Sequence, residues 1–563
     1  MKILSLHCDY LKFKPLKKAI KEPEELKSKE EVLIENPLGI FVAVEKSDET
    51  SQKKSVDELV SNVLDLKDKV KAERIVLYPY AHLSSSLAAP DFAKKVLEEA
   101  EEILRKKGVE IYRAPFGYYK EFELKCKGHP LAELSREIQI KEEKEEYDYK
   151  RLLRQISKTT LDTSKLKEYD HRILGQRLDL FSFNEVAPGM VFWHNNGMII
   201  YKELVNFWRE EHQKAGYKEI ATPQILDKKL WQISGHWEKY KENIFLTDYE
   251  KRMFGVKPMN CPGCILVFKN SPKSYRDLPL RIGELGIVHR KELSGVLAGL
   301  FRLIQFTQDD AHIFCSEKNL KSEIINIINL IDKFYKKFGF DYRVELSTRP
   351  EKRIGDDSIW DKAEKILGDV LEKKKIKYKV NKGEGAFYGP KIDFHIKDSL
   401  GREWQCATIQ LDFAMPERFE LEYTDKDNKR KRPIMVHRVI YGSLERFIGI
   451  LLEHTKGNLP VWLSPIQVRV LSFTDRNIKA AEKILSSLKQ LGIRADSDFD
   501  STTVNEKVRN AELMKIPYII TIGDKEEKEG TIAIRERGKK EIRFGAKFDD
   551  FVEELKKKIE NRE

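Results

Sequence analysis

The chain has 563 residues, of which 35% are charged, and a formal net charge of +11. This charge content leaves no room for a membrane span of about 18 or more apolar residues, and the first residues lack the apolar run of a signal peptide, so we expect a cytoplasmic protein. The length predicts about three or four domains. Six cysteines are too few for a disulfide framework here, which favours free thiols or metal ligands. The mild positive charge permits an anionic partner such as RNA without requiring one.

Residues 1–137 predict a small α/β domain, because short apolar runs alternate with helical periodicity. The clearest helix covers Asp91–Lys107, with Pro90 at its start and Gly108 beyond its end. The expected strands contain Ile3–Leu6, Ile40–Val44 and Ile75–Tyr78. Three polar clusters lie between these elements, and each alone has a structural interpretation: His7 with Asp9, Tyr80–Ser85, and Gly117–Lys120 with Cys126–Pro130.

A charge run separates this domain from the rest of the chain. Lys141–Glu146 contains only lysine and glutamate, and a polar, helix-prone stretch follows it. Such runs are usually solvated faces or linkers. We therefore place a linker at residues 138–168 and start the next domain at Tyr169.

Residues 169–464 form the predicted central domain. Ile200–Gly216 and Ser322–Gly339 have the periodicity of amphipathic helices, and Tyr217–Pro223 follows the first of them as an extended segment. Alternating residues in Ile392–Ile396 and Thr408–Phe413 favour antiparallel strands that turn one polar face to a ligand. A strand at Met435–Arg438 and a helix within Gly442–Glu453 complete the domain.

The central domain is organised around a predicted hairpin. Two apolar runs, Gly286–Val288 and Phe301–Phe306, flank a Ser- and Gly-rich loop. Asp310 and His312 are two residues apart, so on a strand both side chains leave the same face. Singly, an Arg-x-Glu or an Asp-x-His is usually an ordinary surface feature; their conjunction in one hairpin is rare.

A Cys-x-x-Cys pair precedes the hairpin. Cys261 and Cys264 have the spacing of zinc or redox sites, but no second such pair follows to complete a four-cysteine structural site. Both interpretations stay open at this point.

Residues 465–563 show a fresh α/β pattern. The expected strands are Val468–Phe473, Ile493–Asp496, Tyr518–Gly523 and Thr531–Glu536, and the expected helices are Ile478–Leu491, Val504–Lys515 and Phe548–Ile559. Strands and helices that alternate at this pace predict a mainly parallel sheet covered on both faces.

The motifs together resemble those of a known family. His289-Arg290-Lys291-Glu292, the glycine loop and Phe306-Thr307-Gln308-Asp309-Asp310-Ala311-His312 resemble motif 2 of class II aminoacyl-tRNA synthetases, and within that class the threonyl-tRNA synthetases. The segments 200–223 and 435–453 are similar to motifs 1 and 3. The resemblance implies a multidomain α/β and α+β protein: an antiparallel-sheet class II catalytic core, an N-terminal α/β editing domain of the archaeal type with a D-aminoacyl-tRNA deacylase fold, and a C-terminal α/β anticodon-binding domain.

The resemblance also implies an activity and its ATP site. It predicts a threonine-tRNA ligase that forms threonyl-adenylate, with Mg²⁺ bridging the ATP phosphates. Arg290 would contact the α-phosphate, Glu292 the adenine amine and Arg446 the γ-phosphate, as the catalytic residues. Arg302 and Gln405 complete the implied ATP site.

A zinc ion, one per chain, is implied by three residues that are far apart in the sequence. Cys261, His312 and His437 match the family's ligands, and three protein ligands leave the open position that a substrate-binding metal requires. The implied threonine pocket is lined by Gln308, Asp310, Tyr388 and Gln410. A metal that must bind the substrate hydroxyl excludes valine, whereas serine lacks only a methyl, worth about 1–3 kcal/mol.

Because the metal would reject serine only weakly, the N-terminal domain is expected to hydrolyse mischarged seryl-tRNA. The resemblance places His82, Lys120 and Glu133 in this editing site. It suggests Glu526 and Arg535 as anticodon contacts, with Arg509 and Lys515 as further candidates. The implied partners are tRNA(Thr), ATP and L-threonine, with motif 1 forming a homodimer; we expect neither a membrane nor DNA as a partner.

One departure and two alternatives remain. Cys264 stands where the family has a histidine, which leaves its role open. A prolyl or seryl class II enzyme would share motif 2 but would not need Cys261, Asp310, His312 and His437. A non-catalytic RNA-binding paralogue is the second alternative, although Arg290, Glu292 and Arg446 are all intact. The chain lacks the Gly-x-x-x-x-Gly-Lys-Ser/Thr of a P-loop.

Overall fold

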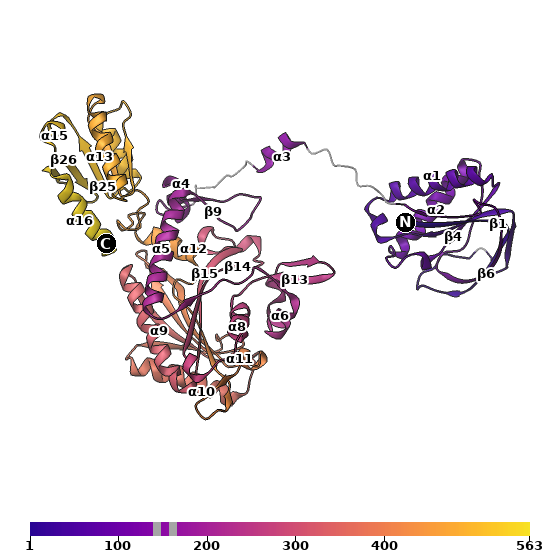
Figure 1. Ribbon diagram of the computed structural model, residues 1–563, viewed down its shortest axis with the longest axis horizontal. Helices are drawn as coiled ribbons and strands as arrows, with labels where there is room; N and C mark the ends of the chain where they lie inside the picture. Colours follow the sequence, from indigo (N-terminus) through magenta and orange to yellow (C-terminus); the bar gives the residue numbers. More distant parts are fainter. Residues whose placement is uncertain (27, 139–147, 157–165) are drawn as a thin grey trace. The chain divides into compact units, whose positions relative to one another are not determined.

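The computed structural model describes residues 1–26, 28–138, 148–156 and 166–563. The chain divides into two compact units, Met1–Asp148 and Tyr149–Glu563, which Figure 1 colours along the sequence. Within the described residues, no helix combines the length and the apolar character needed to span a bilayer.

The first unit is a seven-stranded sheet with two helices packed on one face (Figure 1). The strand order is β2-β1-β3-β4-β5, and β6 and β7 both pair with β1. The bounds are β1 Lys2–Lys18, β2 Val32–Glu35, β3 Pro37–Ala43, β4 Arg74–Pro79, β5 Glu110–Arg113, β6 Tyr118–Cys126, β7 Glu133–Glu137, α1 Gln52–Val70 and α2 Pro90–Lys106.

Alternation along the strands gives this sheet two apolar faces. Ile40 and Val42 pack with the helices, whereas Phe41 joins a second cluster with Leu11 and Phe13 on the opposite face. The three predicted strands and the predicted helix are confirmed, with ends shifted by a few residues. The length of β1 was missed: its second half is covered by β6, where Leu11 pairs with Leu124 and Phe13 with Phe122.

Backbone hydrogen bonds of the first unit extend to Ile138, one residue past the predicted domain end. The Met1 ammonium donates to the Ile138 carbonyl over 2.9 Å, and the Ile138 N–H donates back to Met1 over 2.8 Å. Most of the predicted linker lies outside the described residues. Between its two undescribed stretches is the helix α3, Tyr149–Ile156.

The second unit contains an eight-stranded sheet in the order β10-β14-β15-β22-β19-β18-β16-β17. Its six central strands, from β14 to β16, are antiparallel, and the two edge strands are parallel to their neighbours. The bounds are β10 Lys218–Glu219, β14 Leu280–His289, β15 Gln305–Cys315, β16 Asp341–Ser347, β17 Tyr378–Asn381, β18 Lys391–Lys397, β19 Glu403–Asp412 and β22 Ile434–Val439. The predicted hairpin is confirmed as β14 and β15, but β15 begins at Gln305, so most of the apolar run Phe301–Phe306 precedes the strand.

Helices cover one face of this sheet, and on the other face polar side chains lie beside an apolar cluster that contains Phe314 and Met435. In β15, Ile313 and Cys315 belong to the main core, which helices α5, α9, α10 and α12 complete. The alternate residues Asp310 and His312 face the other way. The helices are α4 His171–Arg177, α5 Asn195–Lys214, α6 Lys228–Ile233, α7 His236–Tyr240, α8 Cys261–Lys269, α9 Glu317–Lys337, α10 Asp357–Lys373, α11 Ala414–Arg418 and α12 Leu444–His454. The two predicted amphipathic helices correspond to α5 and α9.

Small two- and three-stranded sheets accompany this core. Their strands are β8 Phe181–Ser182, β9 Phe192–Trp193, β11 Ile225–Asp227, β12 Leu246–Tyr249, β13 Arg252–Val256, β20 Tyr423–Thr424 and β21 Arg430–Lys431.

The C-terminal part of the second unit is a five-stranded sheet, β24-β23-β25-β26-β27. Strands β24, β23 and β25 are parallel, but β26 and β27 are antiparallel, so the prediction of a mainly parallel sheet was wrong for that half. Helices α13 and α16 pack on one face and α14 on the other, as predicted. The bounds are β23 Val468–Ser472, β24 Ala495–Asp498, β25 Tyr518–Ile522, β26 Ile532–Glu536, β27 Ile542–Ala546, α13 Ile478–Gln490, α14 Val504–Leu513, α15 Asp524–Glu529 and α16 Phe548–Glu560.

Candidate functional site

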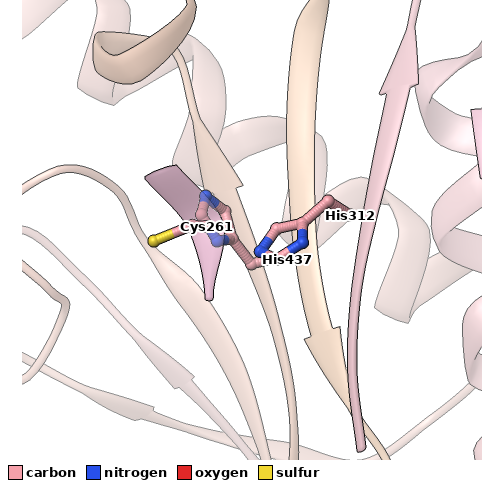
Figure 2. A group of neighbouring side chains, drawn as sticks. All are labelled: Cys261, His312 and His437. Atoms are coloured by element: carbon pink, nitrogen blue, oxygen red, sulfur yellow. The ribbon is translucent and has the colours of Figure 1, made fainter. Parts of the chain in front are cut away.

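Three residues from separate elements meet on the polar face of the large sheet. His312 of β15 and His437 of β22 are opposite one another in the strand register, and Cys261 begins α8. Their ligand atoms all lie within 4.8 Å of one another (Figure 2). The three side chains are buried, with 3%, 1% and 8% of Cys261, His312 and His437 exposed. The structure thus brings together the three residues that the sequence proposed as metal ligands.

The surroundings of this group suit a metal ion. Both ring nitrogens of His312 are buried without a hydrogen-bond partner. His437 Nε2 lies 2.9 Å from Asp412 Oδ2, and an ionised carboxylate accepts the Nε2 proton, which leaves the lone pair on Nδ1. Burial lowers the pKa of His312 and raises that of Cys261, so a cation would offset the penalty of a buried thiolate. Sequence reasoning missed Asp412.

Asp412 is itself held in place. Its Oδ1 accepts from the backbone N–H groups of Ala414 and Met415 over 2.8 and 2.9 Å. A second group within the described residues, Asp170, His171 and Glu453, also has its ligand atoms within 4.8 Å. There His171 is already bonded on both ring nitrogens, so this group is a hydrogen-bond network and not an open site.

Cys264 lies outside the group of three. It is fully buried in α8, and burial together with the nearby Glu284 carboxylate raises the pKa of its thiol. Its ligand atom is not among those that gather around His312 and His437. The residue that departs from the family pattern therefore behaves as a small core side chain.

A cavity of about 320 Å³ opens beside the Cys/His/His group. Its lining contains all four residues proposed for the threonine pocket together with two of the proposed metal ligands: Gln308, Asp310, Tyr388, Gln410, Cys261 and His437. Burial raises the pKa of Asp310 to about 6, although His437 and a 3.2 Å hydrogen bond from Asn260 oppose this shift. Lys391, which pairs with Asp393 over 2.9 Å, also lines the cavity and was not proposed from the sequence.

A second cavity, of about 370 Å³, contains the residues proposed for ATP: Arg290, Glu292, Arg302, Gln405 and Arg446. Arg446 is largely buried, and its Nε donates to the Phe301 carbonyl over 2.8 Å. Burial lowers the pKa of Arg446, and the like charges of Arg290 and Arg302 lower it further. Three converging guanidinium groups favour a polyanion.

Two of these residues are paired with each other. Arg302 forms an ion pair with Glu292 over 2.9 Å, and Gln405 donates to Asp393 over 2.6 Å. The two cavities share Arg290, Gln308 and Gln405 as lining residues. Ligands in the two cavities would therefore meet across a common wall.

The proposed editing residues occupy two places in the first unit. Lys120 Nζ donates to the carbonyls of Pro115 and Tyr118 and lies 5.1 Å from the Tyr78 ring centroid; burial lowers its pKa to about 8. His82 belongs to the same aromatic cluster through Tyr80, with ring centroids 5.4 Å apart. Glu133 interacts with Cys126, near the contact between His7 and His129.

The proposed anticodon residues belong to the C-terminal sheet. Glu526 is buried in α15 and accepts from the Gly523 N–H over 3.1 Å, which gives it a structural role as well. Arg535 lies in the middle of β26, paired with Ile519. Arg509 is exposed on α14, whereas Lys515 follows that helix with a φ of 57°.

Three family models match successive parts of the chain. Residues 1–138 match the archaea-specific editing domain of threonyl-tRNA synthetase, residues 240–455 the class II tRNA synthetase core domain (G, H, P, S and T), and residues 467–558 an anticodon binding domain.

Individual proteins give the same result. The chain is 55% identical over 397 residues to a threonine–tRNA ligase of Desulforamulus reducens and 53% identical to one of Carboxydothermus hydrogenoformans, in each case over 70% of this chain and 62% of the relative. It thus spans 62% of the length of these curated relatives. A crystal structure of the RNA binding domain of threonyl-tRNA synthetase from Cryptosporidium parvum superposes with a TM-score of 0.67 at 40% identity, over 69% of this chain and 98% of that one.

Proposed function

The chain belongs to the threonyl-tRNA synthetase family, and on that premise we propose that it activates L-threonine with ATP and transfers the aminoacyl group to tRNA(Thr). One observation carries the proposal. Two members of the Cys261, His312 and His437 group, Cys261 and His437, line a cavity that shares a wall with a cavity of three arginines. A prolyl or seryl enzyme would not need this group beside its ATP site.

Cys261, His312 and His437 would hold one zinc ion, which would supply Lewis-acid binding of the amine and the hydroxyl of threonine. Asp310, Gln308, Tyr388 and Gln410 would line the rest of the pocket. The buried carboxylate of Asp310 would accept from an N–H of the substrate amine, and the Asn260 amide would hold that carboxylate in place. Valine lacks the hydroxyl and would be rejected.

In the neighbouring cavity, Arg290 and Arg446 would bind the triphosphate, with Mg²⁺ as its counterion. A threonine carboxylate oxygen would form a bond to the α-phosphorus, and the bond from that phosphorus to pyrophosphate would break. Because Arg290 lines both cavities, it would contact the carboxylate and the α-phosphate together. Positioning and charge neutralisation would supply most of the rate.

Amino-acid-dependent ATP–pyrophosphate exchange tests this function. We expect exchange with threonine, some with serine and none with valine, at about one zinc per chain. Folded, zinc-loaded protein that exchanges with none of the three would refute the synthetase function and favour an RNA-binding paralogue. Exchange with valine comparable to that with threonine would refute the metal-based selection.

The first unit would hydrolyse seryl-tRNA(Thr), because selection at the metal leaves serine only one methyl short of threonine. His82, Lys120 and Glu133 would line that site, and the C-terminal domain would contact the anticodon through Glu526 and Arg535. Motif 1 would form a homodimer. The match of residues 1–138 to an editing domain supports this second activity.

The K120A variant tests the editing activity within the full chain. Threonylation should stay near the wild-type rate, while seryl-tRNA(Thr) accumulates. K125A is the matched control, since Lys125 lies on the same strand, is exposed and pairs with Asp9. Clearance of seryl-tRNA by K120A as fast as by the wild type would exclude Lys120 from the editing site. Deletion of residues 1–137 should have the same effect as K120A.

A further inference from the structure

The imidazole of His171 lies beneath the arginine-lined cavity, although sequence analysis gave it no role. His171 begins α4, which Asp170 caps by accepting from the Arg172 N–H over 2.9 Å. The residue is 1% exposed. Its ring is 4.2 Å from the ring of Phe301, measured between centroids, and Phe301 lines the cavity.

Both ring nitrogens of His171 have fixed partners. Nδ1 lies 2.7 Å from Glu453 Oε1, and Nε2 lies 3.0 Å from the backbone nitrogen of Leu300. A backbone N–H can only donate, so Nε2 must carry the lone pair and Nδ1 the proton. The ring is therefore the neutral Nδ1–H tautomer, which donates to Glu453 and accepts from Leu300.

The segment Gly299–Phe301 is fitted closely to this ring. Gly299 has a φ of +52°, and a Cβ at that position would lie 2.2 Å from His171 Nε2. Phe301 packs between His171 and Trp404, with ring centroids 4.4 Å apart on the Trp404 side. These contacts fix where the Phe301 carbonyl points.

That carbonyl in turn fixes Arg446. It accepts from Arg446 Nε over 2.8 Å, which leaves the terminal guanidinium nitrogens for a ligand. No other hydrogen bond holds the Arg446 side chain within the part of the chain that the structure describes. The orientation of Arg446 thus depends on the backbone that His171 holds.

Glu453, the partner of His171 Nδ1, lies on the helix that carries Arg446. Glu453 lies seven residues, or about two turns, after Arg446 on α12, so both project from similar sides. Burial alone would raise the pKa of Glu453, but hydrogen bonds from His171 and Arg402 lower it overall, so it is charged at neutral pH. Arg402 also donates to Asp398 over 2.7 Å, which fixes this anchor to the end of β18.

We propose that His171 is a positioning residue for ATP: it orients Arg446 through the Leu300 N–H and the Phe301 carbonyl without touching the nucleotide. The inference rests on the proposed activation of threonine with ATP. We call this series of contacts, from His171 through Leu300 and Phe301 to Arg446, the relay. It predicts that loss of the Nε2 acceptor weakens ATP binding more than loss of the Nδ1 donor.

Two amide variants separate the two bonds. The amide of H171N can replace the Nδ1–H donor to Glu453 but cannot reach Leu300, whereas the longer H171Q can present its oxygen near the Nε2 position. We expect H171N to raise the Michaelis constant for ATP about tenfold, with that for threonine changed less than twofold. H171Q should recover most of this loss.

His454 offers a matched control on the same helix. Its Nδ1 accepts from the Ser399 backbone N–H over 3.0 Å, and its ring packs 4.4 Å from that of Phe340, away from the cavity. H454Q removes this acceptor, as H171N removes the Nε2 acceptor of His171. It should lower the urea midpoint as H171N does and leave the Michaelis constant for ATP unchanged.

Calorimetric binding of Mg-ATP, measured without threonine, separates this inference from the proposed function. If the wild type shows no exchange but H171N still binds Mg-ATP about tenfold more weakly, the function is wrong and the relay stands. Unchanged ATP binding and Michaelis constant in folded H171N would overturn the relay, and so would an equal effect in H454Q. If H171N does not fold, H171Q provides the test. An H171Q variant that folds but binds Mg-ATP at least tenfold more weakly than H454Q would also contradict the relay.

Discussion

Replacing Asp412 with asparagine should weaken zinc binding by a protein whose fold is nearly unchanged. Asp412 Oδ1 is held by two backbone N–H groups, which fix the orientation of an amide at this position. The NH₂ group of D412N would then face His437 Nε2, where the wild type has an acceptor at 2.9 Å. An NH₂ group donates, so Nε2 would become the acceptor and the ring proton would move to Nδ1. That proton blocks the nitrogen that the metal needs.

Loss of such an outer partner typically lowers metal affinity about 10- to 100-fold, or ~1.4–2.8 kcal/mol. Competition with a chromogenic zinc chelator measures this affinity directly. Burial of Asp412 makes D412N mildly destabilising as well, so a control is needed. D398N serves, because Asp398 is also buried and accepts from Arg402 and Trp404, at the far end of β18. D398N should lower stability and keep the wild-type affinity. Zinc held equally well by D412N and the wild type would refute the tautomer argument.

Other variants test the remaining assignments. C264S should retain about one zinc per chain, whereas C261S should lose it, because only Cys261 belongs to the group of three; zinc loss in C264S, seen by metal analysis, would make Cys264 a ligand. Burial lowers the pKa of Lys120 from 10.5 to about 8, so between these pH values the unfolded chain binds more protons than the folded one, and stability should rise with pH. Over this pH range, the urea midpoint of K120M should rise less than that of the wild type. Equal rises in the two proteins would contradict the lowered pKa of Lys120.

The sequence could predict which residues gather as proposed metal ligands but not the group that would orient them. Cys261, His312 and His437 carry side chains that bind zinc, so a family pattern can select them from a linear sequence. Asp412 is one acidic residue among 92 aspartates and glutamates. Its contact with His437 arises because β19 pairs with β22, and pairings of this kind are set by the register of distant strands. The same reason hides His171, whose partners Leu300 and Glu453 are far along the chain.

The C-terminal sheet shows a signal that was available but was not used. A parallel crossover needs about a dozen residues or more. The connection between β25 and β26, Gly523–Thr531, is shorter than that, although it contains the short helix α15. The chain must therefore turn back, and β26 is antiparallel to β25. Element types were predicted well here because apolar periodicity is local, whereas strand direction depends on the length of the connection.

One register sets both the core and the candidate site. In β15, Ile313 faces the helices and His312 faces Cys261 and His437, so a slip of one residue against β22 would exchange them. Buried carboxylates next to the strand oppose that slip. Asp309 accepts from the Ile440 and Gly442 N–H groups, and Glu445 accepts from the Thr307 N–H. Burial raises the pKa of both carboxyl groups to about 7. Since a slip would leave these polar groups without hydrogen-bond partners, the apolar core and the placement of the three proposed metal ligands are specified together.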